Sequence, residues 1–210
     1  MDHPLIEIET GANPAASVIW LHGLGADGHD FEPVVPALKL AKPVRFVFPH
    51  APVRPVTING GMRMRAWYDI LQLGPGAEDE KGIRESQKIL EGLIEKETRP
   101  VFLAGFSQGG AIVLQTALRY PKKLAGVLAL STYLPLSQKL SLERSKENQD
   151  VPIFMAHGLY DEIIPMQRAK ASRALLEQQG YKVEWREYPM PHSVCPEEID
   201  HISSFLSSRL

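Results

Sequence analysis

Short apolar segments alternate with longer amphipathic ones along this chain of 210 residues. The apolar segments have the length of buried strands and predict strands at residues 5–9, 17–21, 44–48, 66–70, 101–104, 124–130, 153–156 and 183–188. The longer segments predict helices at residues 31–40, 79–97, 108–120, 165–179 and 196–206. Strands that alternate with helices form βαβ units. We therefore predict an α/β fold with a mostly parallel, doubly wound sheet, as a single domain over residues 1–210.

The charge balance and the lengths of the apolar segments exclude several classes of protein. Lys and Arg number 23 against 25 Asp and Glu, which gives a formal net charge of −2. This balance provides no basic face for a phosphate backbone, so we expect no nucleic-acid partner. Apolar runs such as residues 127–130 are far shorter than the roughly 18 residues of a membrane span, so we expect no stable membrane insertion.

The chain has one cysteine, Cys195, which cannot form an internal disulfide. Its first residues lack the charged and apolar regions of a secretory signal peptide. We therefore expect a soluble cytoplasmic protein. The histidines lack the spacing of a metal motif such as H-E-x-x-H, and we predict no metal and no cofactor.

A glycine-rich segment, residues 23–28, follows the predicted strand at 17–21 and fits the pattern G-x-G-x-x-G. Dinucleotide binding requires an acidic residue about 20 positions further on, and the next strand ends in Phe-Val-Phe-Pro-His without one. The segment fits better as a loop that turns a backbone N–H toward a neighbouring strand end and forms half of an oxyanion hole. A flexible turn remains the alternative.

The sequence Gly105-Phe106-Ser107-Gln108-Gly109 lies between a predicted strand and a predicted helix that is apolar almost all round. It matches G-x-S-x-G, in which a serine on a tight turn projects its hydroxyl clear of the sheet. The alternative is an ordinary helix N-cap, since serine often occupies that position. The strand–turn–helix context favours Ser107 as a nucleophile.

A serine nucleophile requires a base to take its proton and an acid to orient that base. His192 follows the predicted strand at 183–188, in a loop stiffened by two prolines, and we interpret it as the base. Asp161 follows the strand at 153–156 and precedes an apolar segment that would bury its carboxylate. Glu162 remains the reserve candidate for the acid, and His157 is expected to make a structural hydrogen bond.

Six segments of this sequence, in order, resemble the carboxylesterase and acyl-protein thioesterase family of serine α/β-hydrolases. They are LHGLGADGHDF at 21–31, WYD at 67–69, GFSQGG at 105–110, LPL at 134–136, HGLYDEIIP at 157–165 and MPHS at 190–193. The chain is most similar to compact bacterial carboxylesterases, which implies an α/β-hydrolase fold with a minimal cap. The resemblance also allows a homodimer.

This resemblance implies a triad of Ser107, Asp161 and His192. It also implies that the backbone N–H groups of Leu24 and Gln108 form the oxyanion hole. The implied acyl pocket, beside a flap that follows WYD, has four candidate residues: Trp67, Leu71, Leu73 and Leu134.

Three functions are consistent with these residues. We expect hydrolysis of carboxylic esters with short to medium acyl chains, through an acyl-enzyme intermediate. The alternative is an acyl-protein or small-molecule thioesterase, or a lysophospholipase, which would use the same steps. A non-catalytic hydrolase fold that only binds a ligand is the third hypothesis, although such a protein should lack a member of the triad. The expected partner is therefore a small-molecule ester or an acylated substrate.

Overall fold

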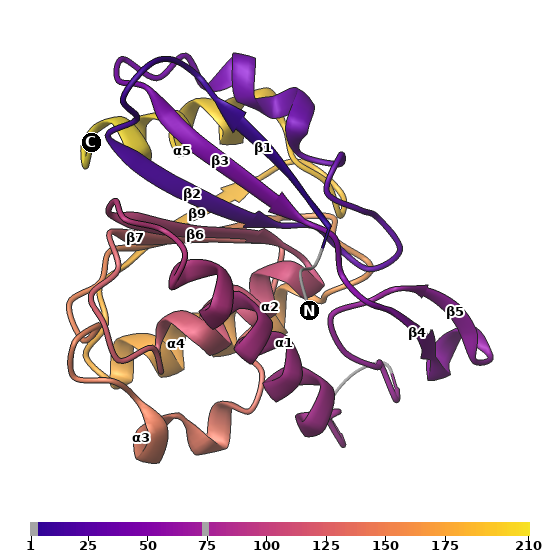
Figure 1. Ribbon diagram of the computed structural model, residues 1–210. Helices are drawn as coiled ribbons and strands as arrows, with labels where there is room; N and C mark the ends of the chain where they lie inside the picture. Colours follow the sequence, from indigo (N-terminus) through magenta and orange to yellow (C-terminus); the bar gives the residue numbers. More distant parts are fainter. Residues whose placement is uncertain (1–3, 73–75) are drawn as a thin grey trace.

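The computed structural model describes residues 4–72 and 76–210, which fold around a seven-stranded sheet (Figure 1). The strands lie in the order β1-β3-β2-β6-β7-β8-β9. β1 pairs antiparallel with β3, and every other pair is parallel. Their bounds are β1 Leu5–Glu9, β2 Ala16–Leu21, β3 Val44–Pro49, β6 Val101–Phe106, β7 Gly126–Leu130, β8 Ile153–Gly158 and β9 Val183–Tyr188. The predicted mostly parallel sheet is confirmed.

Helices cover both faces of this sheet, as a doubly wound fold requires. Figure 1 shows α1, α2 and α4 on one side and α5 on the other, where α5 contacts the 3₁₀ helix η1. The bounds are α1 Glu80–Ile94, α2 Gln108–Ala117, α3 Leu140–Glu143, α4 Met166–Gln178 and α5 Pro196–Ser207, with 3₁₀ helices η1 Glu32–Leu38, η2 Thr57–Asn59 and η3 Ser137–Lys139.

Alternating side chains of the central strands fill two separate cores. In β2, Ile19 and Leu21 belong to the core under α1 and α2, whereas Val18 and Trp20 belong to the core under η1 and α5. This follows from the two-residue period of a strand, which sends successive side chains to opposite faces. Because both faces are covered, β2 is buried along its whole length and its sequence is almost continuously apolar.

Two of the predicted elements are wrong. Residues 66–70 do not form a strand, although Trp67 and Tyr68 are buried as a strand would bury them. The strands of this region instead form a hairpin of β4 (Val53–Val56) and β5 (Met62–Arg65), which projects from the body in Figure 1. The segment predicted as a helix from residue 31 forms η1, which contains two prolines and therefore lacks two backbone donors.

The chain order of the strands creates a crevice at the carboxyl ends of β2 and β6. From β2 the chain first goes to β3 on one side and later returns to β6 on the other side. In an open parallel sheet, a ligand site forms where the strand order reverses in this way, because the loops on the two sides diverge. The loop after β2 and the turn after β6 therefore border the same crevice.

Candidate active site

Ser107 occupies a strained turn between β6 and α2. Its φ of 56° and ψ of −120° are unusual for a residue with a side chain, and such strain is typical of functional sites. The Ser107 N–H donates to the carbonyl of Leu130 at 2.9 Å, and the Thr132 hydroxyl donates to the carbonyl of Ser107 at 2.7 Å. These bonds to the strand β7 and the loop after it hold the turn in place.

The glycines on either side of Ser107 allow this turn. A Cβ on Gly105 would lie 2.5 Å from the carbonyl carbon of Gly109, and a Cβ on Gly109 would lie 2.4 Å from the carbonyl oxygen of Leu21. Both distances are too short for any real contact, so only glycine lets α2 start this close to β6 and β2. The G-x-S-x-G pattern therefore has a steric cause here.

The structure brings Ser107, His192 and Asp161 together in a hydrogen-bonded series. His192 Nε2 lies 2.9 Å from Ser107 Oγ, and His192 Nδ1 lies 2.7 Å from Asp161 Oδ2. The imidazole also packs against the Phe106 ring, with 4.7 Å between the ring centroids. Because the carboxylate accepts a hydrogen bond from the Nδ1–H group, the unprotonated Nε2 faces the serine hydroxyl and can accept its proton.

The Asp161 carboxylate is fixed by its own loop. Its Oδ1 atom accepts hydrogen bonds from the backbone N–H groups of Ile163 at 2.9 Å and Ile164 at 2.8 Å. This leaves Oδ2 for His192, and the Asp161 side chain is fully buried. Glu162, the reserve candidate, is exposed. Loop geometry thus distinguishes two adjacent carboxylates that the sequence left open.

His157 lies below this site in β8. Its Nε2 atom donates to the carbonyl of Ile164 at 2.8 Å, which is the structural hydrogen bond predicted for it. Burial lowers the pKa of His157, so this ring stays neutral beside the Asp161 carboxylate. His157 therefore supports the loop that carries Asp161 and leaves the interaction with Ser107 to His192.

The backbone groups expected to form an oxyanion hole lie beside Ser107. Gln108 is the first residue of α2, and N–H groups in a first helical turn have no acceptor within the helix. Leu24, in the loop after β2, lines the same pocket as Ser107 and Gln108. The positive end of the α2 dipole faces this position and favours an anion there.

A buried histidine holds the loop after β2. The Ala51 N–H donates to His22 Nε2 at 3.0 Å, so the ring proton is on Nδ1, which donates to the Gly23 carbonyl at 2.7 Å. Burial lowers the pKa of His22 to about 4, and the ring is therefore neutral at neutral pH. His22 thereby fixes the backbone that leads directly to Leu24.

The Gln108 side chain fastens α2 to the segment after β5. Its Oε1 atom accepts the Trp67 N–H at 2.7 Å, and its Nε2 atom donates to the Tyr68 carbonyl at 2.7 Å. The Trp67 indole N–H in turn donates to the His22 carbonyl at 2.9 Å. Trp67 therefore links the turn that bears Ser107 to the loop that bears Leu24.

A pocket of about 350 Å³ opens beside Ser107. The apolar residues of its lining are Leu24, Ile58, Ile70, Leu71, Ala77, Ile163, Ile164 and Pro165. An apolar pocket beside a nucleophile suits an acyl chain, because a hydrocarbon chain gains free energy when it leaves water.

Only part of the expected acyl pocket corresponds to this lining. Leu71 lines the pocket, whereas Trp67 is fully buried outside the lining and Leu134 lines a neighbouring cavity. Leu73 lies outside the described residues. The sequence reasoning missed Tyr68, Tyr133, Ile163 and Arg168, which do line the pocket. Tyr68 stands within the WYD segment, but no sequence signal indicated Arg168.

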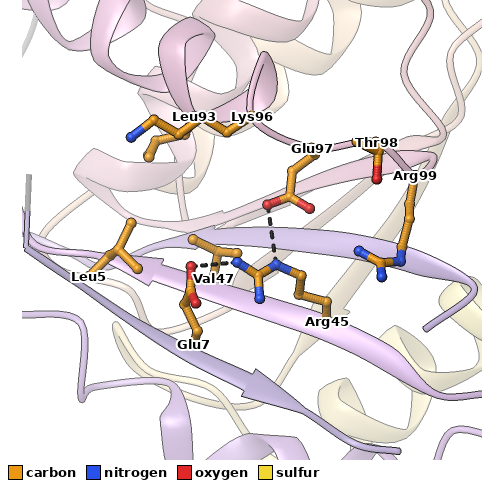
Figure 2. A pocket seen from close by; sticks show the side chains of 9 residues that line it. All are labelled: Leu5, Glu7, Arg45, Val47, Leu93, Lys96, Glu97, Thr98 and Arg99. Atoms are coloured by element: carbon orange, nitrogen blue, oxygen red, sulfur yellow. Dashed lines mark hydrogen bonds and ion pairs between the residues drawn. The ribbon is translucent and has the colours of Figure 1, made fainter. Parts of the chain in front are cut away.

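A separate pocket of about 210 Å³ lies at β1 and β3 (Figure 2). Arg45 occupies its centre and forms ion pairs with Glu7 and with Glu97 at 3.3 Å. Ser107, His192 and Asp161 do not line it. The pocket beside Ser107 therefore remains the candidate active site.

Within residues 4–72 and 76–210, no cluster of three or more His, Cys, Asp or Glu side chains has an arrangement that could hold a metal ion. No helix in the described part of the chain is both long enough and apolar enough to span a membrane.

A doubly wound sheet with a strained serine after a central strand is the architecture of the α/β-hydrolases. Comparison with known proteins agrees with this class. Residues 3–210 match the profile of the family described as Phospholipase/Carboxylesterase, and the chain belongs to this family of hydrolases. The resemblance stated from the sequence motifs is thereby confirmed.

Relatives and solved structures refine the comparison. Acyl-protein thioesterase 1 of Gibberella zeae is 40% identical over 213 residues, which cover 93% of this chain and 91% of that protein. Acyl-protein thioesterase 1 of Neurospora crassa is 40% identical over 225 residues, which cover 99% of this chain and 92% of that protein. Acyl-protein thioesterase 2 of Zea mays superimposes with a TM-score of 0.91 at 26% identity over 99% of each chain. SOBER1 of Arabidopsis thaliana superimposes with a TM-score of 0.86 at 33% identity, over 92% of this chain and 98% of that chain.

Proposed function

We propose that this protein is an acyl-protein thioesterase that uses Ser107, His192 and Asp161 as its catalytic triad. The observation that carries the proposal is the hydrogen-bonded series of these three side chains beside an apolar pocket. Relatives that share about 40% of their residues with this chain are named acyl-protein thioesterases, which supports a thioester of an acylated protein as the substrate.

The first half of the reaction transfers the acyl group to the serine. His192 Nε2 takes the Ser107 proton while Oγ attacks the thioester carbonyl carbon. The carbonyl oxygen becomes an oxyanion, which accepts hydrogen bonds from the N–H groups of Leu24 and Gln108. The C–S bond then breaks, and the imidazolium returns its proton to the leaving thiolate.

The second half releases the acid. Water enters in place of the thiol, His192 takes a proton from it, and the hydroxide attacks the acyl-Ser107 carbonyl. The tetrahedral intermediate collapses to a free carboxylic acid, and His192 returns the proton to Ser107 Oγ. In both halves Asp161 stabilises the imidazolium that forms, and its own position is fixed by the N–H groups of Ile163 and Ile164.

Hydrolysis of carboxylic esters, the function expected first from the sequence, is the second candidate. The description of the family as Phospholipase/Carboxylesterase favours it. The same residues would perform the same steps with an alcohol as the leaving group. The names of the relatives give the thioesterase the stronger support. The cytoplasmic location and the homodimer stay predictions.

One peptide carrying the same acyl group either on cysteine or on serine separates the two candidates. We expect a higher kcat/KM for the S-acyl peptide, and a higher value for the O-acyl peptide would assign the protein as an esterase. Ser107→Ala should lower kcat by about 10⁶ on either substrate. If the variant keeps its activity, or if a fluorophosphonate fails to label the wild-type protein, Ser107 is not the nucleophile.

A further inference from the structure

The pocket beside Ser107 has a neighbour that shares part of its wall. This second cavity, of about 270 Å³, is lined by Leu134, Ala171 and Leu175 among others. Three residues, Glu78, Tyr133 and Arg168, line both cavities, and no other described residue does so. These three side chains therefore form the partition between the cavities.

Arg168 is held at the centre of this partition. Its guanidinium carbon lies 3.3 Å from the centroid of the Tyr133 ring, which is a cation–π contact. Its Nη2 atom lies 3.8 Å from Glu78 Oε1, while Glu78 Oε2 accepts the Leu136 N–H at 2.9 Å. The Tyr133 hydroxyl is 2.8 Å from that of Tyr68, so the ring beneath the guanidinium is held as well.

A charged group at the wall of an apolar pocket limits what the pocket accepts. A hydrocarbon chain that reached the partition would have to displace the guanidinium from Glu78 and Tyr133, or remove it from water without a partner. The ion pair between Arg168 and Glu78 is long, and both side chains retain some exposure to solvent. A substitution of Arg168 should therefore remove this barrier to the acyl chain.

We propose that Arg168, held between Tyr133 and Glu78, ends the acyl pocket and thereby limits the length of the acyl chain that the site hydrolyses best. Removal of its side chain joins the two cavities into one longer channel. The inference rests on the proposed function only in that Ser107 must act on an acyl substrate. It applies to thioesters and to oxygen esters alike.

The test is a series of acyl thioesters of N-acetylcysteine with 4, 8, 12 and 16 carbons, each assayed below its critical micelle concentration. In Arg168→Ala we expect the ratio of kcat/KM for the longest chain to kcat/KM for the shortest chain to rise at least about tenfold. The reason is that each additional methylene group that binds at an apolar site raises kcat/KM by a large factor. Glu78→Gln, which removes the charge that holds Arg168, should move the ratio in the same direction by a smaller factor.

Arg173→Ala is the matched control. Arg173 lies on the same helix, pairs with Glu177 at 2.8 Å, and lines neither cavity, so the wild-type ratio should be kept. A ratio in Arg168→Ala that equals or falls below that of the wild type overturns the proposal. Loss of activity at every chain length in that variant overturns it as well, since Arg168 would then act in another way. A wild-type protein that hydrolyses no acyl substrate would instead refute the proposed function.

Discussion

At the scale of single residues, the site depends on which atoms of a side chain already accept hydrogen bonds from the backbone. Asp161 and Glu162 are adjacent and chemically almost equivalent, yet only Asp161 has one oxygen held by two backbone N–H groups and the other free for His192. The sequence offered both carboxylates. The choice between them depends on the loop conformation after β8, which a residue pattern does not specify.

The pair of carboxylates also provides a matched test. Asp161→Asn should lower kcat by about 10⁴, because an amide in this position favours the wrong tautomer of His192 and does not stabilise the imidazolium. Glu162→Gln should keep the wild-type rate, since Glu162 is exposed. Steady-state kinetics of both variants decide the assignment. Similar rates in Asp161→Asn and the wild type would exclude Asp161 as the orienting acid.

At the scale of elements, the contact of α2 with β6 and β2 decides where the nucleophile stands. The pattern G-x-S-x-G predicted a strand, a turn and a buried helix here, and all three are present. The segment at 66–70 was predicted less well. Trp67 and Tyr68 of this segment pack into the core under α1 and α2, and Gln108 of α2, not a neighbouring strand, binds their backbone.

Two glycine-to-alanine substitutions test this packing. Gly109→Ala should strongly destabilise the protein and abolish activity, because the new Cβ would lie 2.4 Å from the Leu21 carbonyl oxygen. Gly92→Ala lies in the exposed part of α1, where a Cβ meets no atom within 4 Å, and should raise the free energy of unfolding by about 0.5–1 kcal/mol. Urea unfolding and an activity assay measure both effects. Equal stability of the two variants would contradict the steric account of the turn.

At the scale of the whole molecule, the two cores on either face of the sheet set the stability, and a titratable side chain is buried beside one of them. Glu198 in α5 is fully buried, and no side chain of the described residues forms a hydrogen bond with its carboxyl group. Burial raises the pKa of Glu198 to about 8. The folded protein therefore holds this carboxyl group in its protonated form at neutral pH.

This burial predicts a pH dependence of stability. The folded state binds the Glu198 proton more tightly than the unfolded state, whose pKa is near 4.5, so the stabilisation is complete below pH 4.5 and is lost as pH rises toward about 8. Relative to Glu198→Gln, the wild-type protein should lose free energy of unfolding across this interval. Thermal or urea unfolding at several pH values measures it, with the exposed neighbour Glu197→Gln as the control. Parallel curves for wild type and Glu198→Gln would show that Glu198 ionises freely in the folded protein.

Taken alone, the sequence determined the alternation of strands and helices, the serine turn and the three segments that carry the triad candidates. These are local properties, because hydrophobic period and glycine spacing act within a few residues of the chain. The tertiary structure decided which carboxylate meets His192, which apolar residues line the pocket and where Arg168 lies. Those properties depend on contacts between segments far apart in the sequence, such as Tyr133 with Arg168 and Gln108 with Trp67, and only the packed sheet and helices bring such segments together.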